Sequence, residues 1–114
     1  YSTTTSGSSL LSWKKAAIKN NYNVPTKIIC CYPENKDFIL AHTKNIKKTL
    51  SKINNNTNEK QNIRILFSAH GLPEKIIAKG DPYQDQVEKT VSKIVENIDK
   101  NNFSHTIFWD SGSR

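Results

Sequence analysis

Apolar residues recur along the chain in two patterns, which predict helices alternating with strands. Three segments have apolar residues three or four positions apart, the spacing of one helix face: residues 8–20, 35–54 and 82–100. Three shorter apolar runs have the length of buried strands: residues 26–32, 63–69 and 106–109. This alternation favours parallel strands joined by crossovers, an α/β fold that forms part of a doubly wound, Rossmann-type sheet.

The predicted helices have recognisable ends and apolar faces. Ser8 or Ser9 is expected to cap the first helix, and Asp81 the last, with Pro82 in its first position. A short helical turn at 74–79 is expected to end on Gly80. The apolar faces are predicted to be Leu10, Trp13 and Ala17; then Phe38, Ala41, Ile46, Thr49, Leu50 and Ile53; then Val87, Val91, Ile94 and Ile98.

Length and composition indicate one domain cut from a longer protein. The chain has 114 residues, no methionine, and begins on Tyr1, so residues 1–114 are expected to be a fragment. Residues 1–9 are almost all Ser, Thr and Gly and are interpreted as a linker or a phosphate-type loop. The polar stretch 54–62 is predicted to be a surface loop.

Charge and hydropathy exclude several classes of protein. No apolar stretch approaches the ~18–20 residues of a membrane span, and residues at the start of the chain lack the charged-then-apolar order of a signal peptide, so neither a membrane-spanning nor a secreted protein is expected. The net charge of +7 comes mainly from lysine, with Arg64 and Arg114 the only arginines. Without arginine forks and interleaved aromatic residues, no specific nucleic-acid partner is expected, and a basic binding module is a minor alternative.

Cys30 and Cys31 are adjacent within the first apolar run, where a strand would point them to opposite faces. The sequence has no Cys-x-x-Cys spacing of the kind that binds zinc. We interpret them as two small buried hydrophobes in a reducing cytosol, which predicts a cytoplasmic location.

His70 is the principal candidate for chemistry. It stands at the carboxyl end of a predicted parallel strand, where such sheets place ligands, and Gly71 allows a sharp turn after it. An imidazole there can accept a proton or bind a metal; the alternative is a structural role in the turn. His42 and His105 are interpreted as structural, and Ser68 lacks the glycines of a nucleophile elbow.

The chain contains two longer motifs, residues 65–73 (ILFSAHGLP) and residues 80–83 (GDPY). Together they resemble the signature of the ferrochelatases, the lyases that insert ferrous iron into protoporphyrin IX in haem biosynthesis. Residues 1–9 (YSTTTSGSS) resemble a further family segment upstream. The resemblance covers nearly the whole chain, about the middle third of a complete enzyme, and implies a chelatase-like fold. Residues 110–114 depart from the family pattern and form an atypical tail.

The resemblance implies roles for two residues. His70 matches the active-site histidine, as acceptor of pyrrole protons, metal ligand, or both, and Tyr83 matches a tyrosine that lines the porphyrin cleft. Protoporphyrin IX and Fe(II) are then the substrates, with peripheral membrane contact by the whole enzyme. No tightly bound cofactor is expected. Cluster-bearing members have a cysteine near the position of Thr3, so no iron–sulfur cluster is expected either.

The family's catalytic glutamate and much of its porphyrin pocket have no counterpart in these residues. The chain alone is therefore expected to be inactive. A non-catalytic remnant or split-gene piece is the main alternative, and a related chelatase for another metal or tetrapyrrole is the nearest enzymatic one.

Overall fold

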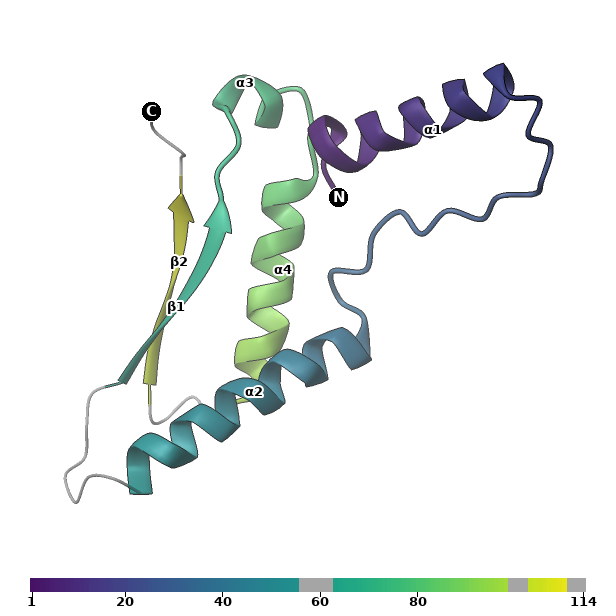
Figure 1. Ribbon diagram of the computed structural model, residues 1–114. Helices are drawn as coiled ribbons and strands as arrows, with labels where there is room; N and C mark the ends of the chain where they lie inside the picture. Colours follow the sequence, from purple (N-terminus) through teal and green to yellow (C-terminus); the bar gives the residue numbers. More distant parts are fainter. Residues whose placement is uncertain (56–62, 99–102, 111–114) are drawn as a thin grey trace.

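The computed structural model describes residues 1–55, 63–98 and 103–110, and confirms a mixed α/β chain (Figure 1). Its elements in order are η1 (Thr3–Gly7, a π-helical turn), α1 (Ser8–Lys19), α2 (Lys36–Asn55), β1 (Ile63–His70), α3 (Glu74–Ile77), α4 (Tyr83–Glu96) and β2 (Phe103–Asp110). Helix α4 ends at Glu96, four residues before the predicted limit of residue 100, so that part of the prediction was wrong. The predicted stop at 101–102, residues 56–62 of the predicted loop and the tail beyond Asp110 lie outside the described residues.

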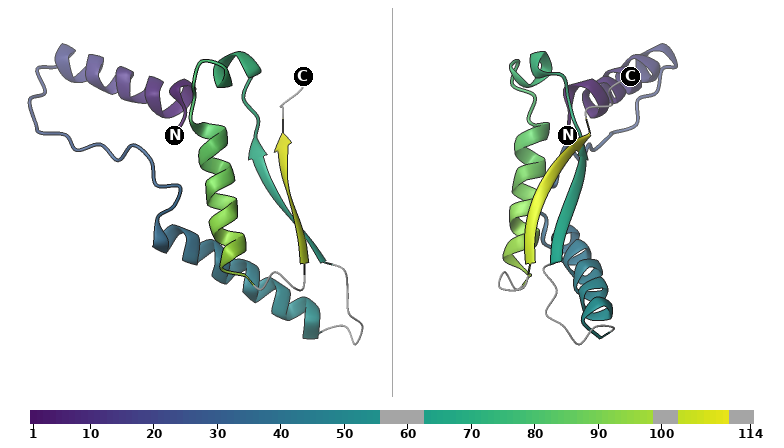
Figure 2. Two further views of the ribbon diagram at one scale, coloured as in Figure 1. Left: turned by 180° about the vertical axis from the view of Figure 1, so that it is seen from behind. Right: turned by 90° about the vertical axis from the view of Figure 1, so that its left-hand side faces the viewer.

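The two described strands form a parallel sheet. Ile63 of β1 pairs with Phe103 of β2, and the register continues to His70 and Asp110. Helices α3 and α4 connect the strands, and α4 lies along one face of the sheet (Figure 2). Both strands end at the same edge, where the backbone N–H of Gly71 donates to the carbonyl of Asp110 at 2.7 Å. The sheet therefore has one covered face and a carboxyl edge with a tight turn.

The core lies where α2 crosses α4 (Figure 1). Ile39, Ile94 and Ile98 are buried together, with Phe67 of β1 packed against them. This confirms the apolar stripe predicted for the last helix.

The predicted face of α2 is partly wrong. Ala41 and Thr49 are exposed, whereas Ile39 and Thr43 are buried. The helix is turned so that Ile39 meets α4. The Thr43 hydroxyl is accommodated in this interface because it donates to the carbonyl of Ile39 at 2.9 Å.

The strand predicted at residues 26–32 is absent, and this prediction was wrong. The segment has no regular secondary structure and connects α1 to α2 (Figure 1). Ile29 is 82% exposed, and Cys30 and Cys31 are exposed rather than buried. A strand needs a neighbour that pairs its backbone groups, and no described strand pairs with this segment.

The start of α1 also differs from prediction. Ser8 is already helical, and its hydroxyl donates back to the carbonyls of Thr4 and Thr5. The chain enters the helix earlier, through η1, so the capping role falls to Ser2, whose hydroxyl accepts from the Thr4 N–H at 3.2 Å. Helix α1 buries none of its predicted face, Leu10, Trp13 and Ala17.

The turn between α3 and α4 follows the prediction closely. Gly80 has a φ of 85°, a left-handed conformation that favours glycine. The Asp81 carboxylate accepts from the backbone N–H of Tyr83 at 3.0 Å, as a capping side chain does, although α4 begins at Tyr83, one residue later than predicted. Among the described residues, no helix is long and apolar enough to cross a membrane.

Candidate functional site

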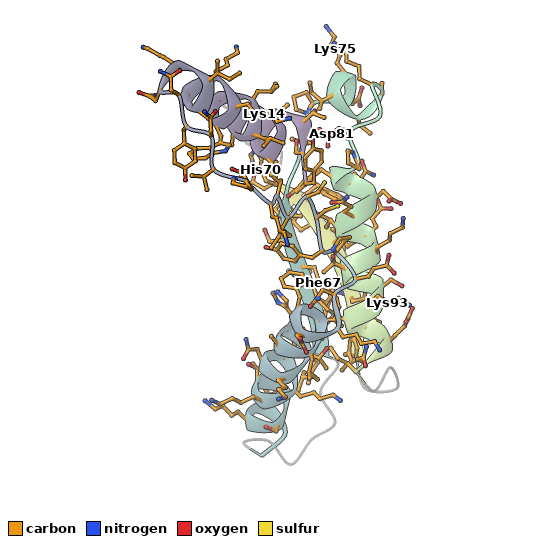
Figure 3. All side chains as sticks on the ribbon, turned by 90° about the vertical axis from the view of Figure 1, so that its right-hand side faces the viewer. Lys14, Phe67, His70, Lys75, Asp81 and Lys93 are labelled. Carbon is orange, nitrogen blue, oxygen red and sulfur yellow. The ribbon has the colours of Figure 1, made fainter. Side chains whose placement is uncertain are left out.

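His70 is the last residue of β1, and its side chain is exposed. Burial alternates along the strand, so Ile65 and Phe67 face the helices while Ser68 and His70 share the outer face. Figure 3 labels Phe67 and His70 on this strand. The sequence therefore placed His70 correctly at the carboxyl edge of a parallel strand, with its imidazole accessible.

The carboxylate of Asp81 accepts hydrogen bonds from the opening segment and from the start of α4. Its Oδ2 atom accepts from the Ser2 hydroxyl at 3.0 Å, the Thr3 N–H at 2.7 Å and the Thr3 hydroxyl at 2.6 Å. Its Oδ1 atom accepts from the N–H of Tyr83. We call Ser2, Thr3, Asp81 and Tyr83 the Asp81 cluster. It joins the opening segment to the start of α4, two of the three segments that carried the family resemblance.

The carboxyl of Asp81 is held in its ionised form. The Thr3 hydroxyl is the largest cause of a pKa lowered to about 2, and the N–H groups of Thr3 and Tyr83 and the Ser2 hydroxyl act in the same direction. Burial opposes them, since Asp81 is only 7% exposed. At neutral pH this carboxylate therefore serves as an anchor and not as a proton donor.

Tyr83 lies on the helix side of the sheet. Its ring meets that of Trp109 of β2 edge to face, with centroids 6.5 Å apart and planes at 67°. It also lines a cavity of about 750 Å³ between β1, α2, α4 and residues 29–33. Beside it, the amino group of Tyr1 donates to Oε1 of Gln86 at 2.9 Å, which ties the start of the chain to the cavity wall.

The two predicted site residues are not brought into one cavity. Tyr83 lines the space on the covered side of the sheet, whereas His70 is not among the lining residues and faces outward. Both lie near the carboxyl edge, on different faces. Within the described parts of the chain, no group of three or more His, Cys, Asp or Glu side chains is arranged to hold a metal ion.

The other histidines lie away from this edge. His42 is in α2, with its ring edge to face against Phe38 at 4.7 Å, and His105 is near the start of β2, 6.3 Å from the ring of Phe67. Sequence reasoning missed the link from Ser2 and Thr3 to Asp81. Ser2 and Thr3 are 79 and 78 positions from Asp81, and no local sequence pattern predicts a hydrogen bond over that separation.

Comparison with known proteins places the chain clearly. The ferrochelatase family model matches residues 1–113. The chain is 50% identical over 111 residues to the ferrochelatase of Pelagibacter ubique (strain HTCC1062), covering 97% of this chain and 30% of that protein. It is 42% identical over 111 residues to that of Rickettsia bellii (strain OSU 85-389), covering 97% of this chain and 28% of that protein. The chain thus spans under a third of the length of these two curated relatives.

Proposed function

Because the chain belongs to the ferrochelatase family, we propose that it forms part of an enzyme that inserts Fe(II) into protoporphyrin IX. His70 is the residue that carries the chemistry, as acceptor of a pyrrole proton or as a ligand to the incoming iron. Tyr83 contacts the porphyrin. The observation that carries this proposal is the exposed imidazole of His70 at the carboxyl edge of the parallel sheet.

The reaction requires a base. As Fe²⁺ enters the macrocycle, two pyrrole N–H bonds break, the nitrogens bind the iron and two protons leave. Histidine suits this task because its protonation changes near neutral pH. His70 takes one proton in this scheme, and the second leaves to water or to an acceptor outside this chain.

The carboxyl edge is held in place for this role. The Gly71–Asp110 hydrogen bond joins the ends of the two strands next to His70. On the other face, the Asp81 cluster fixes the start of α4, from which Tyr83 reaches the 750 Å³ cavity. Fixed backbone on both sides favours a positioned base and a positioned aromatic wall.

A second proposal concerns the chain by itself: it needs further polypeptide to act. Its accessible surface is 9281 Å², against roughly 6,300 Å² for a compact protein of this mass. Its radius of gyration is 18.9 Å, against roughly 13 Å for a compact chain of this length. Apolar side chains such as Leu66 and Phe108 stand exposed on the outer sheet face. An open scaffold of this kind holds a base without enclosing a porphyrin.

A chimera tests both proposals. This chain replaces the aligned segment of the Pelagibacter ubique ferrochelatase, and insertion of Fe(II) or Zn(II) into protoporphyrin IX is followed by absorbance. We expect an active chimera, and a rate lower by at least ~100-fold after His70→Ala because a positioned base is lost. The 114-residue chain alone should be slower than the chimera by about 1000-fold or more.

The matched control is His105→Ala, which removes an exposed imidazole from the opposite end of the sheet and should leave the rate within about 2-fold. A His70→Ala chimera that binds protoporphyrin and keeps the full rate refutes the role of His70. A chain that works alone at the chimera's rate refutes the need for further polypeptide.

A further inference from the structure

Cys30 and Cys31 are the only cysteines of the chain, and both are exposed. They lie in the irregular segment between α1 and α2, where no ladder forces neighbouring side chains to opposite faces. The side-chain interaction with Cys31 is the main cause of a raised pKa at Cys30. The chain therefore presents two accessible thiols on adjacent residues.

The pair also faces a space. Cys30 and Cys31 line the 750 Å³ cavity together with Tyr32, Phe38 and His42. Tyr32 and Phe38 meet edge to face with centroids 5.5 Å apart, which gives this part of the wall an aromatic surface. A group bound by both sulfur atoms would have apolar surroundings on one side and solvent on the other.

We propose that Cys30 and Cys31 form a dithiol site that chelates one soft, thiophilic centre of the trivalent-arsenical type. The proposal rests on the exposure of the two adjacent thiols and on the cavity that both residues line, and is independent of the role of His70. A tetrahedral zinc site is not favoured, because within the described residues no third ligand joins the pair.

A disulfide between the two is also disfavoured. Adjacent Cα atoms lie ~3.8 Å apart across a trans peptide. Disulfides usually need a Cα separation of roughly 4.4–6.8 Å. A chelated atom relieves this constraint, because each sulfur bonds to the central atom and not to the other sulfur.

The chemistry balances without a redox step. With phenylarsine oxide, two S–H bonds break and two As–S bonds form. The arsenic-bound oxygen leaves as water with the two protons, and the arsenic stays trivalent. Because both thiol protons leave in that water, no net proton is released, and equilibrium binding should not change with pH while both thiols are protonated.

The test is titration of the full chain with phenylarsine oxide, read by intact mass spectrometry under native conditions. We expect one adduct per chain, equal to the reagent minus one water, which resists a monothiol and is removed by a dithiol. Cys30→Ser and Cys31→Ser should each weaken binding by at least ~100-fold, because the second bond is no longer intramolecular.

Both variants change exposed side chains in an irregular segment, so circular dichroism should show an unchanged fold. A Thr26→Ser variant, in the same segment, serves as a control and should bind like the parent. An adduct that a monothiol removes, or single variants that bind as tightly as the parent, overturn the proposal. So do thiols that react with Ellman's reagent only after denaturation.

Discussion

At the scale of single residues, Asp81 has two structural roles, and only one of them can be predicted from its position in the sequence. As the residue before Pro82 and α4 it caps the helix, which local spacing predicts. It also accepts hydrogen bonds from Ser2 and Thr3 across 78 or 79 positions of sequence. Charged acceptors form the stronger hydrogen bonds, so this one carboxylate holds the opening segment to the rest of the chain.

Asp81→Asn should release that segment. The neutral amide accepts more weakly, and it presents N–H donors where the carboxylate presents acceptors. We expect amide exchange at Thr3 to speed up on the order of 10-fold or more, measured by hydrogen–deuterium exchange at neutral pH. Asp85→Asn is the matched control, because Asp85 is exposed and forms an ion pair with Lys89 on the surface of α4. Equal exchange at Thr3 in both variants would contradict the role of Asp81.

The same carboxyl predicts a dependence on pH. Its pKa falls from 3.8 to about 2 on folding, so the unfolded chain takes up the proton first. The stabilisation is complete above about pH 4 and is lost as the pH falls through 2. The melting temperature of the parent chain should therefore fall as the pH is lowered from 4 to 2. Asp81→Asn should show a shallower decline over that window, and identical profiles would count against the assignment.

At the scale of elements, the crossing of α2 and α4 carries the core. Ile39 and Leu40 are neighbours on α2, yet Ile39 is 5% exposed and Leu40 is 49% exposed. Only Ile39 meets Ile94 and Ile98. Two consecutive residues of equal size thus have opposite roles.

Ile39→Ala should lower the free energy of unfolding by ~2–5 kcal/mol, since it leaves a cavity in the α2–α4 contact. Leu40→Ala, which removes similar apolar volume from an exposed site, should cost less than ~1 kcal/mol. Urea unfolding followed by circular dichroism measures both. Similar losses in the two variants would show that α2 packs through a different face.

Residues 26–32 show a limit of prediction from local sequence. The apolar run has the composition of a buried strand, but composition does not show whether a neighbouring strand is available to pair with it. A strand forms only where a neighbour pairs its N–H and C=O groups. Here the segment stays irregular, and the Cys30 and Cys31 side chains are exposed instead of buried in a sheet.

At the scale of the whole molecule, the sheet is covered on one face only. Leu66 is 65% exposed on the outer face, while Phe67, the next residue, packs against the core. Alternating strands expose one face when nothing covers it. The outer face carries two exposed apolar side chains, Leu66 and Phe108, among polar ones, and further polypeptide would pack on these two.

The effect of Leu66→Ser on stability should differ between the 114-residue chain and the chimera. In the 114-residue chain it should change the free energy of unfolding by less than ~0.5 kcal/mol, because the side chain is already in water. In the chimera we expect added polypeptide to cover this face, so that the same change should cost at least ~1.5 kcal/mol. Phe67→Ser is the control and should cost at least ~2 kcal/mol in both settings. A cost for Leu66→Ser that is equally small in both would contradict a covered outer face.

The sequence by itself determined the features that depend on near neighbours. These are the α/β class, the helices α2 and α4, both described strands, the turn at Gly80 and the position of His70 at a strand end. Periodicity, capping and turn chemistry depend on residues a few positions apart, so these features can be predicted from the sequence alone.

Only the tertiary structure decided the features that depend on distant partners. It joined Ser2 and Thr3 to Asp81, turned Ile39 and not Ala41 toward α4, and left residues 26–32 outside the sheet. It also placed Tyr83 and His70 on different faces of one edge. Each of these outcomes depends on which surface is available to pair or to pack against, and that surface exists only once the chain is folded.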